Sequence, residues 1–347
     1  MTPRTLVARL DSAGDVLLQG PAVRAVAASS RHVTLLCGPR GEAAARLLPG
    51  VDEVVTYPAE WIDPEPRRVT LSGVMHLVGR LVRLELDAAV ILTSFHQSPL
   101  PLALLLRLAG VRRIGAISED YAGSLLDVRH TVDGGAHEVE RSLSLARAMG
   151  FRPPAGDGGG LQVLRPGHLP ADAVGLLPYV AVHPGASVPA RAWSPAKHAA
   201  LVRLLVANGQ RVVITGSRDE TDLCAAVAGP ERPEVLDLAG RTDLAGLAEV
   251  LAGARALVAG NTGPAHLAAA VGTPVVSLFA PVVPAERWRP WRVRHRLLGR
   301  QDAPCAGTRA RVCPVPGHPC LEEVEPADVL DALEEVAGDG DLVGRAS

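Results

Sequence analysis

The segment 260–264, of sequence GNTGP, has the residue types of an anion-binding turn. Gly260 and Gly263 permit a tight turn, Thr262 is a good helix N-cap, and Pro264 suits the first helical position. Such a turn directs unpaired backbone N–H groups and the positive end of a helix towards one point. Because it follows an apolar strand, we expect it at the carboxyl edge of a parallel sheet, where open α/β folds bind ligands. The segment therefore predicts a diphosphate site.

A carboxylate near the N-terminus is the second residue that could do chemistry. Asp15 follows Gly14 in the segment 10–18, of sequence LDSAGDVLL. In one interpretation Asp15 is a helix N-cap that complements the helix dipole. In the other it faces a cleft and acts as a general base, and both can hold together. The segment lacks a G-x-G-x-x-G pattern, which argues against a dinucleotide-dependent oxidoreductase.

Other loops after predicted strands carry polar residues that could contact a nucleotide. Ser187 and Arg191 share one loop, and Arg191 could either pair with a phosphate or be a solvated arginine. Glu220 stands near a helix start, where it could complement the dipole or accept hydrogen bonds from ribose hydroxyls. His266, in the first turn after the glycine turn, could donate to a phosphate or be a packing residue. Each loop is a weak signal alone, but all follow predicted strands.

The elements that position these residues alternate between strands and helices, the rhythm of a doubly wound α/β fold. Strands are expected at 5–10, 32–37, 51–56, 88–92, 113–116, 162–164, 179–183, 211–215, 235–237, 255–259 and 275–279. Helices are expected at 15–28, 41–48, 71–84, 100–109, 139–149, 194–208, 220–228, 244–253, 264–271 and 325–336. The first helix contains Pro21, which predicts a kink there.

A segment rich in Gly and Pro, 151–178, interrupts this rhythm and predicts an interdomain connection. We therefore expect an α/β protein of two Rossmann-like domains that face a central cleft. The first domain is placed at 1–165 and the second at 175–322, followed by a C-terminal helix and tail at 323–347. A chain of 347 residues suits two domains of ordinary size.

Composition excludes several classes of function. The net charge of −2 and the 3% of aromatic residues argue against nucleic-acid binding, which needs a basic face and stacking side chains. Charges interrupt the N-terminal segment, and the most apolar stretch is too short to span a bilayer. We expect a cytoplasmic protein without stable membrane insertion. Five cysteines in this length do not make a disulfide framework.

Two patterns near the C-terminus imitate metal sites. Four potential ligands stand close in sequence: Cys305, Cys313, His318 and Cys320. They lack a C-x-x-C pair, so we expect no metal there. The segment 339–341 (DGD) imitates the D-x-D motif, but it lies in a Gly-rich tail and is interpreted as solvated charge.

Taken together, these segments resemble glycosyltransferase family nine, whose best-known members are bacterial ADP-heptose:lipopolysaccharide heptosyltransferases. The resemblance begins at 14–18 (GDVLL) and is most specific at 262–270 (TGPAHLAAA). Further matches are 113–115 (RIG), 191–193 (RAW) and 240–242 (GRT). The resemblance implies the GT-B fold, an inverting mechanism, and no requirement for a metal or another cofactor.

The resemblance also implies roles for single residues. It makes Asp15 the catalytic base. The donor-binding residues that it implies are Ser187, Arg191, Glu220, Thr242, Asn261, Thr262, Gly263 and His266. Asn261 stands where family members usually have Asp, which leaves the donor sugar and base open. A second departure is the segment 280–284 (APVVP), where Gly-Pro-Thr is common.

The predicted function is transfer of a heptose-like sugar from a nucleotide-diphosphate donor, most simply ADP-heptose. The acceptor would be a hydroxyl of an envelope glycan or a secondary metabolite. Two alternatives remain open: a nucleotide-sugar epimerase of the same architecture, which needs no acceptor, and a non-catalytic nucleotide-sugar binding protein. Retention of Asp15 counts against the second alternative.

Overall fold

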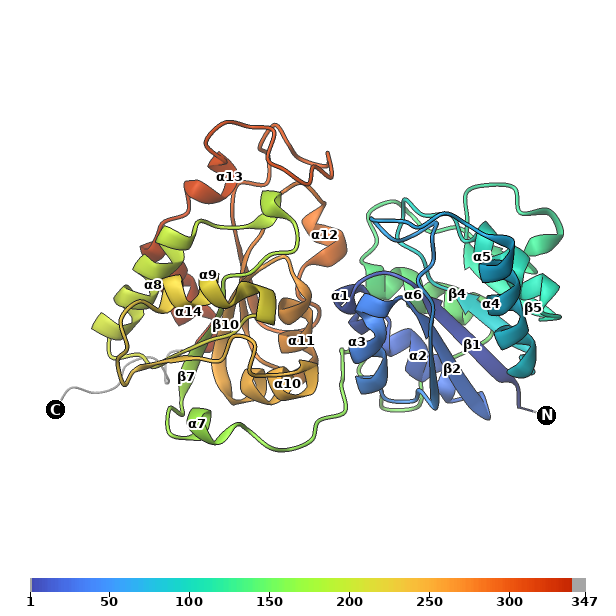
Figure 1. The fold of residues 1–347 in the computed structure, drawn as a ribbon, viewed down its shortest axis with the longest axis horizontal. Coiled ribbons are helices and arrows are strands. Elements are labelled where there is room, and N and C mark those ends of the chain that lie inside the picture. The colour runs from blue at the N-terminus through green and yellow to red at the C-terminus, as the bar shows by residue number, and fades with distance from the viewer. Residues whose placement is uncertain (1, 339–347) are drawn as a thin grey trace. The chain divides into compact units, whose positions relative to one another are not determined.

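The computed structural model describes residues 2–338, which form two compact units (Figure 1). The first unit ends at Leu164 and the second begins at Arg165. Each unit contains one six-stranded sheet in which every paired strand is parallel. Parallel strands buried on both faces explain the nearly continuous apolar runs in the sequence.

The first unit has the strand order β3-β2-β1-β4-β5-β6, which is the doubly wound order of a dinucleotide fold. Its strands are β1 (Arg4–Arg9), β2 (His32–Cys37), β3 (Glu53–Thr56), β4 (Ala88–Ile91), β5 (Arg113–Ile117) and β6 (Val128–His130). Its helices are α1 (Ala13–Leu17), α2 (Gly20–Ala27), α3 (Glu42–Leu47), α4 (Leu71–Arg83), α5 (Leu100–Leu108) and α6 (Glu138–Ala148). The order reverses between β1 and β4, so this is the switch point at which such sheets bind ligands.

The second unit repeats this arrangement, with the order β12-β11-β10-β7-β8-β9. Its strands are β7 (Tyr179–His183), β8 (Val212–Ile214), β9 (Val235–Asp237), β10 (Ala254–Gly260), β11 (Val275–Leu278) and β12 (His295–Leu298). Its helices are α7 (Ala171–Val174), α8 (Pro195–Ala207), α9 (Thr221–Ala228), α10 (Leu244–Gly253), α11 (Gly263–Val271), α12 (Ala285–Trp288), α13 (Pro319–Glu322) and α14 (Pro326–Ala337). Its switch point lies between β7 and β10.

Each unit has its own apolar core. In the first unit, α4 and α5 pack against each other and bury leucines such as Leu77 and Leu102 on the sheet, together with Leu6 and Ala8 of β1. In the second unit, α8 and α14 pack against each other, and they cover the sheet at β8 and at β10 to β12 respectively. Because β1 alternates its side chains between faces, Arg9 points to the face opposite α4 and α5.

Three sequence predictions about these elements are wrong or incomplete. Residues 162–164 form no strand: Leu164 donates its N–H to the carbonyl oxygen of Leu47 at 2.7 Å, at the end of α3, instead of joining the sheet. The helix predicted for 15–28 is two helices, because Pro21 lies in the first turn of α2, where its missing N–H costs little. The short strands β6 and β12 were not expected.

Within the described residues, no helix combines the length and apolar character needed to cross a membrane.

Candidate active site

In the first unit, polar side chains converge on Arg9 at the carboxyl ends of β1 and β4. Arg9 is 1% exposed. Its Nε lies 2.7 Å from Asp11 Oδ2, its Nη2 3.1 Å from Asp15 Oδ1, and its Nη1 3.0 Å from Glu138 Oε2. Nη2 also donates to Ser94 Oγ at 2.9 Å. One guanidinium therefore faces three carboxylates at the switch point of the sheet. We call these five residues the Arg9 cluster.

The charges of the Arg9 cluster shift one another's titration. Burial alone lowers the pKa of the Arg9 guanidinium, but Asp11, Asp15 and Glu138 outweigh it and raise that pKa above its ordinary value. Burial raises the pKa of Asp11, and the charge of Asp15 acts in the same direction against the attraction of Arg9. The cluster carries more carboxylates than its one central cation can neutralise.

Asp15 itself is held by α1. The N-cap of α1 is Ser12, and Asp15 is the third helical residue. The Ser12 hydroxyl donates to Asp15 Oδ2 at 2.7 Å, and the Ser12 N–H does so at 3.4 Å. The interpretation of Asp15 as the N-cap is therefore wrong, because Ser12 holds that position. The side chain of Asp15 stays 23% exposed, so the carboxylate is positioned and accessible.

The sequence prediction missed the rest of the Arg9 cluster. Glu138, the first residue of α6, is 1% exposed and pairs with both Arg9 and Arg141. Gln19 donates to the Asp15 carbonyl oxygen at 2.7 Å and accepts from Ser142, which ties α6 to the same site. One signal was present in the sequence: Arg9 directly follows the apolar residues 6–8 of a strand, where a charge must be paired if it is buried.

In the second unit, a pocket of about 310 Å³ opens at the carboxyl ends of β7 and β10. Five predicted donor-binding residues line it: Ser187, Glu220, Thr242, Thr262 and Gly263. The other lining residues are His183, Gly185, Gly216, Ser217, Asp243, Leu244, Leu247 and Pro264. Residues from four loops therefore meet at the second switch point.

Three predicted donor-binding residues do not line this pocket. Asn261 and His266 are buried, and Arg191 is half-buried. The backbone of Arg191 nevertheless lies close to the turn at 260–263. A Cβ placed on Gly260 would lie 3.1 Å from the Arg191 carbonyl oxygen. Close packing of the two loops explains why glycine suits position 260.

The glycine turn ends in a helix start whose N–H groups are not capped by a side chain. Thr262 is the N-cap of α11, as predicted, with extended backbone dihedrals. Its hydroxyl lies 3.5 Å from the Gly260 carbonyl oxygen and makes no cap hydrogen bond. Since Thr262, Gly263 and Pro264 line the pocket, the open N-terminus of α11 borders it. This arrangement suits an anion.

Glu220 closes the opposite wall of the pocket. Its Oε2 accepts from the Ser217 N–H at 2.7 Å and from the Ser217 hydroxyl at 2.9 Å. An added Cβ at Gly185 would lie 2.0 Å from Glu220 Oε1, so any side chain at position 185 would displace the Glu220 carboxylate. His183 Nε2 lies 3.9 Å from the Glu220 carboxylate. Burial lowers the pKa of His183 more than the charge of Glu220 raises it, so the neutral imidazole is favoured.

The C-terminal thiols belong to the core. Cys305 and Cys320 are buried and Cys313 is half-buried. Burial raises the pKa of Cys320 to about 11. Among residues 2–338, no group of three or more His, Cys, Asp or Glu side chains is placed to hold a metal ion. The predicted solvated charge at 339–341 lies outside the described residues.

Comparison with known proteins places the chain in a family. The model of "Glycosyltransferase family 9 (heptosyltransferase)" matches residues 75–318. Lipopolysaccharide heptosyltransferase 1 of Pseudomonas aeruginosa is 34% identical over 227 residues, which cover 62% of this chain and 61% of that protein. The chain spans from about a third to just under two thirds of the length of the first curated relatives it matches.

Two solved structures extend the likeness over nearly the whole chain. The glycosyl transferase family 9 protein of Veillonella parvula superposes with a TM-score of 0.75 at 16% identity, covering 96% of this chain and 97% of the other. The heptosyltransferase WaaC of E. coli, solved with ADP-2-deoxy-2-fluoro heptose, gives 0.71 at 20% identity, covering 96% and 99%. The expected two-domain α/β architecture is confirmed, and this chain belongs to glycosyltransferase family 9, with the GT-B fold.

Proposed function

We propose that this chain is a glycosyltransferase that moves a heptose-like sugar from a nucleotide-diphosphate donor, ADP-heptose, to an acceptor hydroxyl. Membership of family 9 supports the reaction class. The observation that carries the proposal is the uncapped N-terminus of α11 on the wall of the switch-point pocket. Backbone N–H groups and a helix dipole directed into a pocket favour a diphosphate.

In this proposal the donor binds the second unit. Its diphosphate lies against the first turn of α11, and Arg191, beside that turn, assists. Glu220 accepts hydrogen bonds from the ribose, and the backbone at Thr242 contacts the base. A volume of about 310 Å³ is at the lower end of the range for small-molecule pockets, and this pocket is open to solvent. The polar groups that line it would fix the orientation of the nucleotide.

Asp15 is the general base of the proposed reaction. Its carboxylate removes the proton of the acceptor hydroxyl, whose oxygen attacks the anomeric carbon. The bond from that carbon to the diphosphate breaks on the opposite side, so the anomeric configuration inverts. The negative charge that develops on the leaving diphosphate is stabilised by the α11 N–H groups and Arg191, in place of a metal ion.

The acceptor is a hydroxyl of an envelope glycan or a secondary metabolite and binds mainly the first unit. A nucleotide-sugar epimerase would instead change the donor without any acceptor. Calorimetric titration with ADP, GDP and UDP tests the donor site first, and ADP is expected to bind most tightly. Incubation with ADP-heptose then separates the two activities: the proposed function needs an added acceptor before ADP is released. Consumption of the donor without one would favour the epimerase.

A further inference from the structure

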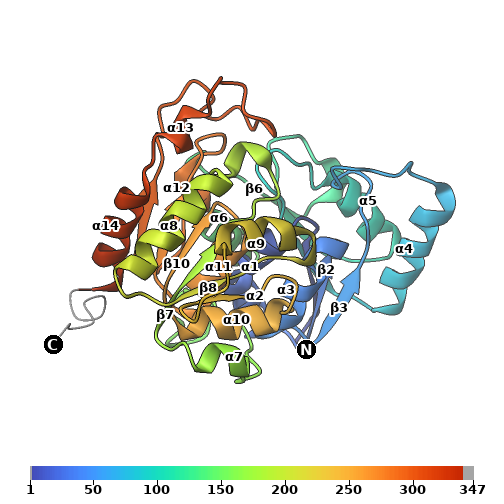
Figure 2. The same cartoon turned by 60° about the vertical axis from the view of Figure 1, so that its left-hand side comes forward.

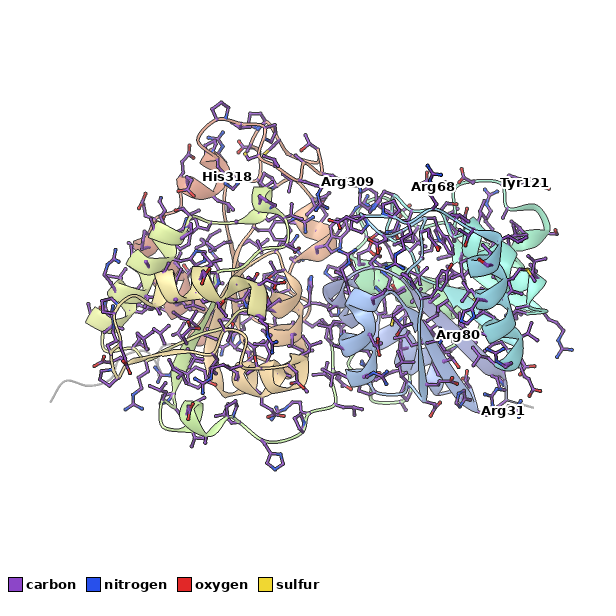
Figure 3. All side chains as sticks on the ribbon, in the orientation of Figure 1. Arg31, Arg68, Arg80, Tyr121, Arg309 and His318 are labelled. Carbon is purple, nitrogen blue, oxygen red and sulfur yellow. The ribbon has the colours of Figure 1, made fainter. Side chains whose placement is uncertain are left out.

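One buried titratable side chain in the pocket of the second unit has no role in the reaction proposed above. His183, the last residue of β7, is 7% exposed and lines the pocket. Among the six histidines of the described second unit, it is the one that does so. His318, labelled in Figure 3, instead lies 3.2 Å from the Ala190 carbonyl oxygen through its Nε2. A titratable group buried in the wall of a binding pocket is a candidate for function.

The sheet places His183 between the two ends of the proposed donor site. Strand β7 lies between β10 and β8, and these strands can be followed in Figure 2. On one side His183 is paired in register with Ala259, which leads into the turn at 260–263 and the uncapped start of α11. On the other side, the loop after β8 brings Glu220 Oε2 to 3.9 Å from His183 Nε2. His183 therefore lies where the diphosphate and the ribose of a bound nucleotide would meet.

The imidazole of His183 has one nitrogen fixed and the other open. Its Nδ1 lies 3.1 Å from the Thr215 hydroxyl oxygen. Because a hydroxyl can both donate and accept, this hydrogen bond is possible with a neutral or a protonated ring. The Nε2 atom makes no hydrogen bond within the described residues, and its nearest charged neighbour is the Glu220 carboxylate. A ring held in this way can offer Nε2 to an oxygen atom of a ligand in the pocket.

The charges that face His183 decide whether its ring is protonated. Glu220 favours the imidazolium, whereas burial, His198 of α8 and the positive end of α11 oppose it. Asp243, the N-cap of α10, lines the same pocket. Burial outweighs Glu220 and lowers the pKa of His183. A diphosphate against α11 would bring negative charge beside the ring and offset the helix end, which raises the pKa of His183 again.

We propose that His183 donates a hydrogen bond from Nε2 to the donor diphosphate and takes up a proton from solvent as the donor binds. The leaving diphosphate then faces one more cation. This inference rests on the proposed donor site and adds a coupling between donor binding and pH. Because the ring holds a proton more tightly in the complex than in the free chain, donor affinity rises as the pH falls. One proton can change the affinity by at most about tenfold per pH unit.

Calorimetry with ADP-heptose, without an acceptor, tests the coupling between pH 6 and pH 8. Buffers that differ in ionisation enthalpy give the number of protons taken up for each ligand bound. Both phosphates of ADP-heptose are esterified, so neither titrates in this range, as the terminal phosphate of ADP would. His183→Gln keeps a side chain that can form hydrogen bonds but cannot titrate. His295→Gln is the matched control, since His295 lies on β12 and does not line the pocket.

We expect the parent chain and the control to bind ADP-heptose about fivefold or more tightly at pH 6 than at pH 8, with proton uptake. His183→Gln should take up no proton, and its affinity should change less than about twofold over this range. Thermal unfolding checks that each variant is folded, and His183→Asn is the second variant if His183→Gln is not.

The outcomes separate this inference from the proposed function. Binding of ADP-heptose by the parent chain without proton uptake would overturn the role of His183, whatever the variants do. Equal proton uptake by the parent and a folded His183 variant would also overturn it, because another group would then titrate. No binding of ADP-heptose by the parent chain at any pH would contradict the proposed donor site itself.

Discussion

Arg9 is the residue on which the polar chemistry of the first unit converges. It reaches Asp11, Asp15 and Glu138 from strand β1, and it is almost completely buried. Buried carboxylates are tolerated only when they are paired, so the cluster depends on this guanidinium. At the same time Arg9 and Ser12 together fix both oxygens of Asp15. The proposed base is therefore oriented by its surroundings before any substrate binds.

Replacing Arg9 with Met should destabilise the first unit strongly. The variant leaves Asp11 buried without the cation that pairs with it and leaves Glu138 with Arg141 alone, which costs about 3–5 kcal/mol. Urea unfolding measures the loss, and the same substitution at the exposed Arg83 is the control. A loss at Arg9 no larger than at Arg83 would show that the cluster does not hold this unit together.

Replacing Asp15 with Asn should affect turnover but not donor binding. The amide keeps the shape of the side chain but cannot take a proton, so kcat/KM should fall by about 100-fold or more. Affinity for ADP, measured by calorimetry, should remain that of the parent, because the donor pocket lies in the other unit. Full activity in the variant would remove Asp15 from the role of base.

At the scale of elements, the loops after β7, β8, β9 and β10 line the pocket that we propose for the donor, and close packing between these loops restricts their backbone. The loop after β7 passes under the Glu220 carboxylate, and the turn after β10 packs on the loop that carries Arg191. The first turn of α11 is left uncapped on the pocket wall. The pocket is therefore sensitive to the backbone of its loops as well as to its side chains.

A methyl group at Gly185 should damage this pocket. Its Cβ would lie 2.0 Å from Glu220 Oε1, so the carboxylate must leave Ser217 or the loop must move. We expect Gly185→Ala to weaken ADP binding by about tenfold or more, the cost of one displaced charged hydrogen bond. Gly175→Ala is the matched control, since a Cβ there meets no atom within 4 Å. Equal ADP affinities in the two variants would contradict the packing described for the β7 loop.

Helix α8 adds a dependence of stability on pH. Burial lowers the pKa of His198 to about 4, from an ordinary value of 6.5. Above pH 6.5 the His198 side chain is neutral in both the folded and the unfolded chain, so it does not lower the free energy of unfolding. As the pH falls from 6.5 towards 4, His198 binds a proton in the unfolded chain but remains largely neutral in the folded chain. The free energy of unfolding should therefore fall by about 3 kcal/mol over this range.

His198→Gln removes this titration. Urea unfolding of both proteins between pH 7 and pH 4 should show a steeper decline for the parent chain than for the variant. Parallel declines would mean that His198 is not held neutral by its burial.

Periodicity predicted the long elements well, because their apolar patterns are complete within each segment. The bounds predicted for β7 and α10 agree with the structure, and the glycine turn, with Thr262 as N-cap, lies where it was expected. The strands β6 and β12 were missed, since both are short and each includes an arginine and a histidine. The Arg9 cluster could not be predicted from local sequence, because Arg9 and Glu138 are 129 positions apart.

At the scale of the whole molecule, the two units share one strand order, and each has its polar site at the same switch point. In the first unit that position holds the Arg9 cluster with Asp15, and in the second it holds the uncapped helix start. The equivalence lets one architecture carry the two sites of the proposed reaction, the base Asp15 and the pocket for the donor diphosphate. Because every residue that lines the proposed donor pocket comes from the second unit, we expect donor binding to belong to that unit alone.

Residues 165–347, expressed separately, should therefore fold and bind ADP. This unit has its own apolar core and all the residues of the donor pocket. Calorimetry should give an affinity within about tenfold of that of the full chain, since few ligand contacts would be lost. A folded second unit without measurable ADP affinity would show that the first unit supplies part of the donor site.

The most direct test of the central claim is a crystal structure of the chain with ADP. The account predicts the diphosphate at the first turn of α11, within hydrogen-bond distance of the Gly263 N–H, with the ribose beside Glu220. Density for ADP at any other place, or an empty pocket at a saturating ADP concentration, would contradict it.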